Sequence, residues 1–170
     1  LLDACKIIKE EMEEKGIIIE LFGTDFENNK KVLLECIEQY GLEKVLQVNG
    51  PVYEEDKIST MLNADLFIIT SRFEGQPIAV LEAMAIGLVP IVTKGTTFME
   101  LVEEKKCGFP AGDGAEEIAK AILKAFNEKE QLPQMSQNAI KVIQEKYEWK
   151  KVTENLLTQY KKIIQKGKEI

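Results

Sequence analysis

The segment SRFEGQPIAVLEAMAIG, residues 71–87, decides how this chain of 170 residues folds. It follows a short apolar run at residues 65–70, which predicts a buried parallel strand. Pro77 suits the first position of a helix, where its missing N–H would have no partner anyway. The helix expected at residues 78–86 is apolar on nearly every side, so we expect it to pack on more than one face.

Two carboxylates flank the start of this helix, Glu74 in the loop and Glu82 in the helix itself. A carboxylate on an apolar helix is costly unless water or a partner satisfies it. One interpretation places Glu82 at a solvated rim. The other places both carboxylates around a cleft at the carboxyl end of the strand, with the free N–H groups of the helix start between them as an anion site. A ligand with a phosphate that binds those N–H groups and hydroxyls that bind the carboxylates would be a sugar nucleotide.

The spacing Glu74-x7-Glu82, set within SRFEG-x-P-x4-EAMA-x-G, resembles the EX7E signature of glycosyltransferase family 4. The family comprises retaining, nucleotide-sugar-dependent enzymes of two Rossmann-like domains (GT-B), and the resemblance covers nearly the whole chain as the second, donor-binding domain. It implies that Glu74 is the catalytic-site contact to the transferred sugar and that Glu82 holds the ribose. Many members have Gly-Phe-Gly after the first glutamate, whereas Pro77 here removes one backbone donor. The implied substrate-binding residues are Glu82, Gly75, Gln76, Pro77, Ile78, Val52 and Thr96.

Two of these residues lie outside the central segment. The loop at residues 49–52 matches the family's loop near the nucleotide base, where backbone groups of Pro51 or Val52 could bind the base. A plain strand-ending turn is an equal alternative for this loop. Residues 95–100 are similar to the family's Gly-Gly-x-x-Glu stretch, with Thr96 in place of the second glycine. This similarity implies a cleft-lining loop with a weak role for Thr96 and Thr97.

Composition limits the classes of function. A net charge of −7 argues against nucleic-acid binding, which relies on basic surfaces. The chain has no histidine, which excludes imidazole catalysis and most zinc sites, and no metal or cofactor is implied besides the UDP- or GDP-linked donor. Three widely spaced cysteines indicate reduced thiols and a cytoplasmic protein. No apolar run reaches the ~20 residues that span a bilayer.

Strand and helix patterns alternate along the chain, which predicts a doubly wound parallel α/β sheet. Strands are expected at residues 17–22, 44–48, 65–70, 89–93 and 108–111. Helices are expected at residues 1–15, 25–40, 53–63, 78–86, 97–104, 115–127, 131–147 and 149–166, with Asp113 as the cap of the sixth.

A complete sheet of this class has six strands in the order 3-2-1-4-5-6, and the five candidates leave out the central one. We therefore expect no direct pairing between the strands at 17–22 and 65–70. Either upstream residues fill the gap, which we favour, or a neighbouring copy or a rearranged segment does. The family's first strand, and the Arg/Lys pair that it places on the donor phosphates, would lie upstream of Leu1. Residues 148–170 are expected to form a C-terminal helix, bent away after Tyr147, that crosses back to a missing N-terminal acceptor domain.

These observations favour the donor-binding domain of a hexosyltransferase of polysaccharide biosynthesis, acting on a glycan or lipid-linked acceptor. The expected partners are a nucleotide-sugar and the missing acceptor domain, through which the protein could associate peripherally with a membrane. By itself this part of the enzyme should not turn over, because the phosphate-binding pair is absent. Two alternatives stay open: a UDP-sugar 2-epimerase of similar architecture, and a non-catalytic binding or scaffold domain.

Overall fold

A computed structural model of the chain describes residues 1–25 and 27–166. The strands are β1 (Ile19–Leu21), β2 (Leu46–Val48), β3 (Leu66–Ile69), β4 (Val89–Thr93) and β5 (Phe109–Ala111). The α-helices are α1 (Leu2–Ile7), α2 (Lys9–Lys15), α3 (Asn29–Tyr40), α4 (Glu54–Leu62), α5 (Ile78–Ala85), α6 (Met99–Glu104), α7 (Ala115–Asn127), α8 (Leu132–Val142) and α9 (Trp149–Lys166). Short 3-10 turns cover Lys94–Thr96 and Lys129–Gln131, and a π-helical segment, η3, covers Ile143–Tyr147.

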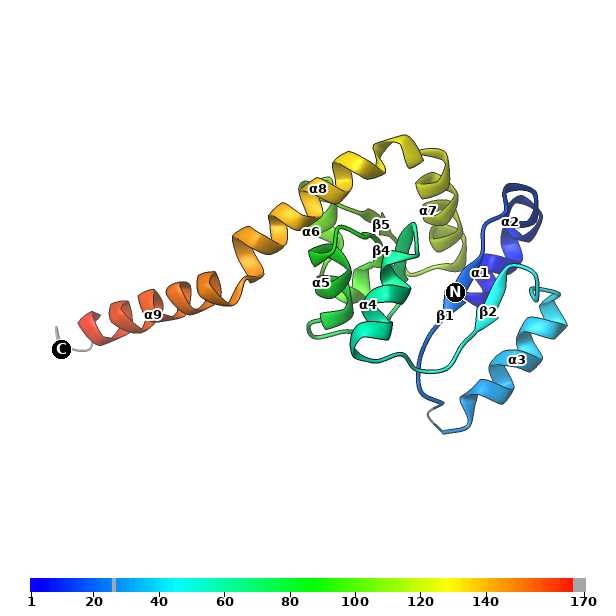
Figure 1. The fold of residues 1–170 in the computed structure, drawn as a ribbon, viewed down its shortest axis with the longest axis horizontal. Coiled ribbons are helices and arrows are strands. Elements are labelled where there is room, and N and C mark those ends of the chain that lie inside the picture. The colour runs from blue at the N-terminus through cyan, green and yellow to red at the C-terminus, as the bar shows by residue number, and fades with distance from the viewer. Residues whose placement is uncertain (26, 167–170) are drawn as a thin grey trace.

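The strands form two parallel sheets rather than one continuous sheet (Figure 1). β1 pairs with β2, with Ile19 opposite Leu46. β4 lies between β3 and β5 in the second sheet. In the described part of the chain β1 does not pair with β3. The interruption predicted between these two strands is therefore confirmed, and the order matches a doubly wound sheet without its central strand.

The interruption changes the burial of β3. All four of its residues are large and apolar, yet each is only half-buried, whereas every residue of β4 is buried. β4 has side chains of a neighbouring strand on both edges, while β3 has them on one edge only, along β4. The prediction of a buried strand at residues 65–70 is thus wrong for this structure, because a central strand needs two neighbours to cover its side chains.

One hydrophobic core joins the two sheets. It combines buried side chains of α1, β1 and β2, such as Cys5 and Leu46, with those of β4, β5 and α7, such as Phe109 and Ile122. α1 packs directly against α7 (Figure 1). These helices therefore hold the sheets together on one face, although no strand pairing does so.

A second core covers the other face of the three-stranded sheet. Buried side chains of α5, α6 and α8, including Met84, Val102 and Ala139, meet Val92 of β4 there. α5 contacts β3 and β4 of the sheet as well as α8 and η3, which confirms that it packs on more than one face. The N-terminal end of α5 remains open to solvent, because Ile78 at its start is 58% exposed.

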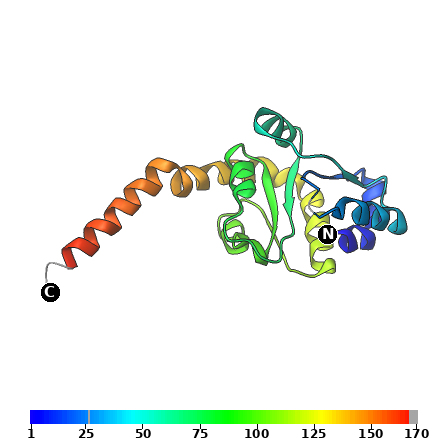
Figure 2. The same ribbon diagram turned by 90° about the horizontal axis from the view of Figure 1, so that it is seen from below.

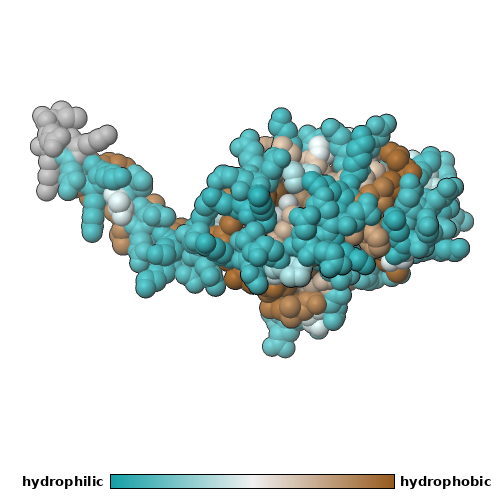
Figure 3. All heavy atoms as spheres, turned by 90° about the horizontal axis from the view of Figure 1, so that it is seen from above, coloured by the Kyte–Doolittle hydropathy of each residue, from teal (hydrophilic) through white to brown (hydrophobic). Residues whose placement is uncertain are grey.

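The C-terminal helices confirm the predicted bend. η3 ends at Tyr147, and Glu148 is extended (φ −61°, ψ 132°) before α9 begins. α9 then leaves the body of the molecule as an arm (Figures 1 and 2). Every described side chain from 149 to 165 is exposed. Figure 3 shows hydrophobic atoms uncovered along this arm. The exposed large hydrophobic residues are Trp149, Val152, Leu156, Leu157, Tyr160, Ile163 and Ile164.

One helix is divided and two others begin differently from the predictions. The helix expected over residues 1–15 is divided at Ile8, whose backbone (φ −110°, ψ 21°) leaves the helical region. Pro77 precedes α5 as its N-cap instead of forming its first residue. Asp113 does not cap α7: Gly114 is the N-cap, and its N–H donates to Oε2 of Glu117 at 3.1 Å. A carboxylate three residues into the helix thereby replaces the expected cap.

The start of α3 also differs, because the helix begins four residues later than expected. Asn28 has a left-handed backbone (φ 59°), and the Asp25 carboxylate accepts a hydrogen bond from the N–H of Lys30 at 2.9 Å. Asp25 thus caps the helix across a short loop. Residues 26 and 167–170, which belong to two of the expected helices, lie outside the described residues.

Candidate functional site

The loop after β3 is held against the loop after β4. The N–H of Glu74 donates to the carbonyl of Gly95 at 2.7 Å, and the hydroxyl of Thr93 donates to the carbonyl of Ser71 at 2.7 Å. A Cβ at position 95 would lie 2.3 Å from the carbonyl carbon of Arg72. Only glycine therefore permits this crossing, which fixes the backbone that carries Glu74.

The Glu74 carboxylate is oriented by its own loop. The hydroxyl of Ser71 donates to Oε1 of Glu74 at 2.8 Å, and both side chains are half-buried. The carboxylate therefore has a defined direction while part of it still reaches solvent. Such a group can accept hydrogen bonds from the hydroxyls of a ligand.

α5 begins four residues after Glu74, at Ile78. The N–H groups of Ile78 and Ala79 have no preceding helical carbonyl to bind, so they are available to an anion at the positive end of the helix dipole. The N–H of Val80 already donates to the carbonyl of Pro77 at 3.0 Å. Pro77 is buried at this point, whereas Gly75 and Gln76 are exposed beside it. The segment 75–78 thus forms an open backbone surface between the two glutamates.

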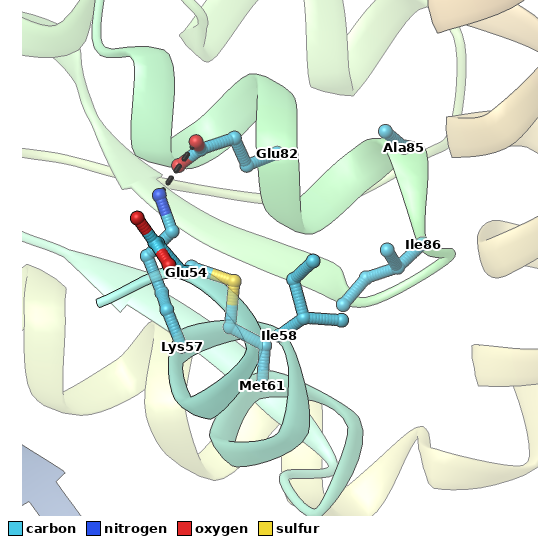
Figure 4. A pocket seen from close by; sticks show the side chains of 7 residues that line it. All are labelled: Glu54, Lys57, Ile58, Met61, Glu82, Ala85 and Ile86. Atoms are coloured by element: carbon cyan, nitrogen blue, oxygen red, sulfur yellow. Dashed lines mark hydrogen bonds and ion pairs between the residues drawn. The ribbon is translucent and has the colours of Figure 1, made fainter. Parts of the chain in front are cut away.

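The Glu82 carboxylate is paired with a lysine that the sequence analysis missed. Nζ of Lys57, on α4, lies 2.6 Å from Oε1 of Glu82 (Figure 4). Both side chains are about one-third exposed (34% and 39%). Neither earlier interpretation anticipated this pair. No local spacing rule connects residues 25 positions apart, so the sequence held no signal for it.

A pocket of about 360 Å³ opens between α4 and α5 at this ion pair. Its polar end carries Glu54, Lys57 and Glu82, and its other walls are apolar (Figure 4). The apolar wall residues are Ile58, Met61, Ala85 and Ile86. Glu82 therefore stands at the mouth of a pocket, not at a plain solvated rim.

The two predicted residues from other loops differ in accessibility. Val52 is half-buried in the loop before α4. Thr96 is fully buried: its hydroxyl donates to the carbonyl of Thr93 at 2.7 Å and accepts a bond from the N–H of Phe98 at 3.4 Å. In this structure Thr96 braces its loop, and the neighbouring Thr97 is the exposed residue. The Thr96 side chain is therefore closed to a ligand in this structure, and the weak role expected of Thr96 and Thr97 stays a prediction.

The cysteines have no visible role in this site. Burial raises the pKa of both the Cys5 and the Cys107 thiols to about 11, so they stay protonated at neutral pH. Within the described residues no group of three or more Cys, Asp or Glu side chains converges as a metal site would require. None of the described helices is both long and apolar enough to cross a membrane.

Comparison with known proteins finds relatives of similar sequence. A GDP-mannose:cellobiosyl-diphosphopolyprenol alpha-mannosyltransferase of Xanthomonas oryzae pv. oryzae is 27% identical over 143 residues, which cover 81% of this chain and 37% of that protein. The chain thus spans about a third of the length of the curated relatives that it matches.

Solved structures show the same fold. The C-terminal domain of a glycosyl transferase group 1 family protein (LpcC) from Francisella tularensis superposes with a TM-score of 0.73 at 21% identity, over 87% of this chain and 77% of that one. Anabaena Alr3699/HepE, in complex with UDP, gives a TM-score of 0.78 at 22% identity, over 95% of this chain and 44% of that one. The family model described as "Glycosyl transferases group 1" matches residues 1–142. The chain belongs to this family.

Proposed function

We propose that this chain is the donor-binding domain of a retaining glycosyltransferase that uses a UDP- or GDP-sugar. One observation carries the proposal: a single loop–helix unit at the carboxyl end of β3 presents Glu74, the open start of α5 and then Glu82. Ligands of open α/β sheets bind at this end of the strands. The unit offers hydroxyl acceptors on both sides of an anion site, as a sugar nucleotide requires.

In this proposal each part of the unit has its own role. Glu74 accepts hydrogen bonds from the hydroxyls of the transferred sugar, and Glu82 accepts them from the ribose. Backbone N–H groups around Gln76 and Ile78 face the diphosphate, while Pro77 contributes no donor. Val52 lies in the loop proposed to contact the base. The domain would act by positioning the donor and stabilising the leaving diphosphate.

The named relatives support a nucleotide-sugar as the ligand class. The Xanthomonas relative is named for GDP-mannose, and HepE was solved with UDP and with UDP-glucose. Both bases therefore occur among the similar proteins. Transfer to a glycan or lipid-linked acceptor is proposed for the whole protein, together with an acceptor domain that completes the cleft.

The exposed arm formed by α9 supports the proposal of a separate acceptor domain. α9 leaves the body as an arm (Figure 1) and carries apolar residues such as Leu156, Leu157 and Tyr160, which are about half exposed. Exposed apolar surface of this kind marks an interaction site. We infer that α9 docks on the acceptor domain and fixes it across the cleft.

The test is a ligand panel measured by thermal unfolding with UDP, GDP, ADP and their sugar conjugates. If Kd is about 1 mM, about 10 mM ligand stabilises the fold by about 1.4 kcal/mol. That corresponds to a rise of about 3–6 °C in Tm for a domain of this size. No shift with any nucleotide would refute the proposal.

Two substitutions then divide the roles. Glu82→Gln should lose most of the stabilisation by the nucleoside diphosphate. Glu74→Gln should keep that stabilisation and lose only the additional effect of the sugar-linked ligand. Glu35→Gln, on exposed α3, is the matched control and should behave as the unsubstituted protein does. Equal losses of diphosphate binding in the first two variants would contradict this division.

A further inference from the structure

The Lys57–Glu82 ion pair differs from the others in the molecule. Among the ion pairs of the described residues, it is the only one that joins residues more than four positions apart, and its 2.6 Å contact is the shortest. It connects α4 to α5 at the mouth of the pocket (Figure 4). The pair therefore depends on the tertiary fold and not on helical spacing.

α4 has little else to hold it in place. None of its nine residues, all of them described, is buried. Its large apolar side chains Ile58 and Leu62 are 47% and 63% exposed. Figure 2 shows the helix at the margin of the body. A helix with so little buried surface gains little from packing, so the position of Lys57 and the direction of Glu82 depend on each other.

The carboxylate keeps room for a ligand while Lys57 is bound. An ionised carboxylate offers about four lone-pair directions, and Lys57 uses one of them on Oε1. Within residues 1–25 and 27–166, Oε2 of Glu82 has no hydrogen-bond partner. Two vicinal hydroxyls can therefore bind the same carboxylate without displacing the lysine.

The charges around the site also favour a lysine beside Glu82. A diphosphate at the start of α5 would approach Glu74, Glu82 and the pocket residue Glu54, in a chain with a net charge of −7. The ammonium of Lys57 offsets the negative charge of Glu82 next to the expected diphosphate position. Arg72 is the chain's only arginine and is exposed in the loop, without an ion pair among the described residues.

We propose that Lys57 is a positioning residue for recognition of the donor ribose. Its ammonium orients Glu82 toward the ribose hydroxyls and offsets the charge of that carboxylate while a nucleoside diphosphate binds. This inference rests on the proposed function, since it assigns Glu82 to the ribose. A purely structural tie between α4 and α5 is the competing role.

The test measures how well the protein distinguishes a ribonucleotide from one without ribose hydroxyls. The probes are UDP and 2′,3′-dideoxy-UDP, or the guanine pair if GDP binds more tightly, titrated by NMR or calorimetry. The unsubstituted protein should prefer the ribonucleotide by about tenfold or more, because hydrogen bonds to a charged group are strong. Lys57→Met should reduce this preference to less than about threefold. The dideoxy analogue should lose less affinity than UDP does, and its smaller loss measures the charge that Lys57 offsets.

Two further variants separate positioning from stability. Lys57→Arg keeps the charge and the donor and should restore most of the preference. Lys105→Met breaks a similarly short pair, 2.7 Å to Glu104 on α6, and should leave the preference unchanged. Unfolding midpoints of all variants show how much each substitution affects the fold itself.

The outcomes distinguish the two proposals. If Lys57→Met keeps the full ribose preference, or weakens both nucleotides equally, Lys57 is only a structural tie and the inference is wrong. If the unsubstituted protein binds both nucleotides equally, the assignment of Glu82 to the ribose fails, and the inference fails with it. Loss of the preference in Lys57→Met and in Glu82→Gln, with recovery in Lys57→Arg, supports the inference.

Discussion

Substitution of Gly95 by alanine tests the loop crossing that holds Glu74. The added Cβ would lie 2.3 Å from the carbonyl carbon and oxygen of Arg72 and 2.4 Å from the carbonyl oxygen of Ser71. Ordinary contact begins at 3.4 Å, so the two loops must separate by about 1 Å. All three neighbours are backbone atoms, and no flexible side chain can move aside in their place.

The loss of folding free energy depends on the contacts that this separation breaks. The 2.7 Å hydrogen bond from the Glu74 N–H to the Gly95 carbonyl spans the same crossing and would be lost. Overpacking costs about 1–3 kcal/mol, and a lost hydrogen bond adds about 1 kcal/mol. We therefore expect Gly95→Ala to destabilise the fold by about 2–4 kcal/mol. Because Glu74 moves, the additional stabilisation by a sugar-linked ligand should also disappear, while nucleoside diphosphate binding through Glu82 persists.

Urea unfolding measures the stability change, and ligand-dependent unfolding measures the binding change. Gly50→Ala is the matched control, since a Cβ there meets no atom within 4 Å. It should leave the stability equal or slightly higher, because alanine reduces the entropy of the unfolded chain. If Gly95→Ala unfolds at the same urea concentration as Gly50→Ala and keeps the preference for the sugar-linked ligand, the loops do not cross as described.

Three further predictions concern the rest of the molecule. Only Cys36 should react with iodoacetamide at pH 8, because the pKa of Cys5 and of Cys107 is about 11. Between pH 9 and 11 the unfolded chain releases these thiol protons before the folded one does, so urea unfolding should show a stability loss approaching about 3 kcal/mol per thiol across this window, smaller in the Cys→Ala variants. Amides of β3 that face away from β4 should exchange with solvent faster than those of β4, and equal protection would mean that another strand covers this edge. Leu157→Glu on α9 should change the free energy of unfolding by less than about 0.5 kcal/mol, whereas a larger loss would show that the arm packs on the body.

Local patterns in the sequence were sufficient for several parts of the fold. The apolar run before Ser71 and the proline before Ile78 predicted a strand, a loop and a helix, and the structure has them at β3 and α5. The bounds of α7 and α9 agree with the predicted ranges, and the bend lies at Glu148 as expected. These features depend on periodicity, capping and chain direction, which act within a few residues.

The candidate site required contacts between distant segments. Glu74 and Glu82 could be named from their spacing, but Lys57, the Gly95 crossing and the burial of Thr96 could not. Likewise, the composition of β3 indicates a buried strand, and only its missing neighbour leaves it half-buried. Sequence spacing specifies which residues share one element, whereas burial and ion pairing depend on which elements become neighbours in space. That choice is made by packing of the whole chain, and it decided how the two glutamates are held.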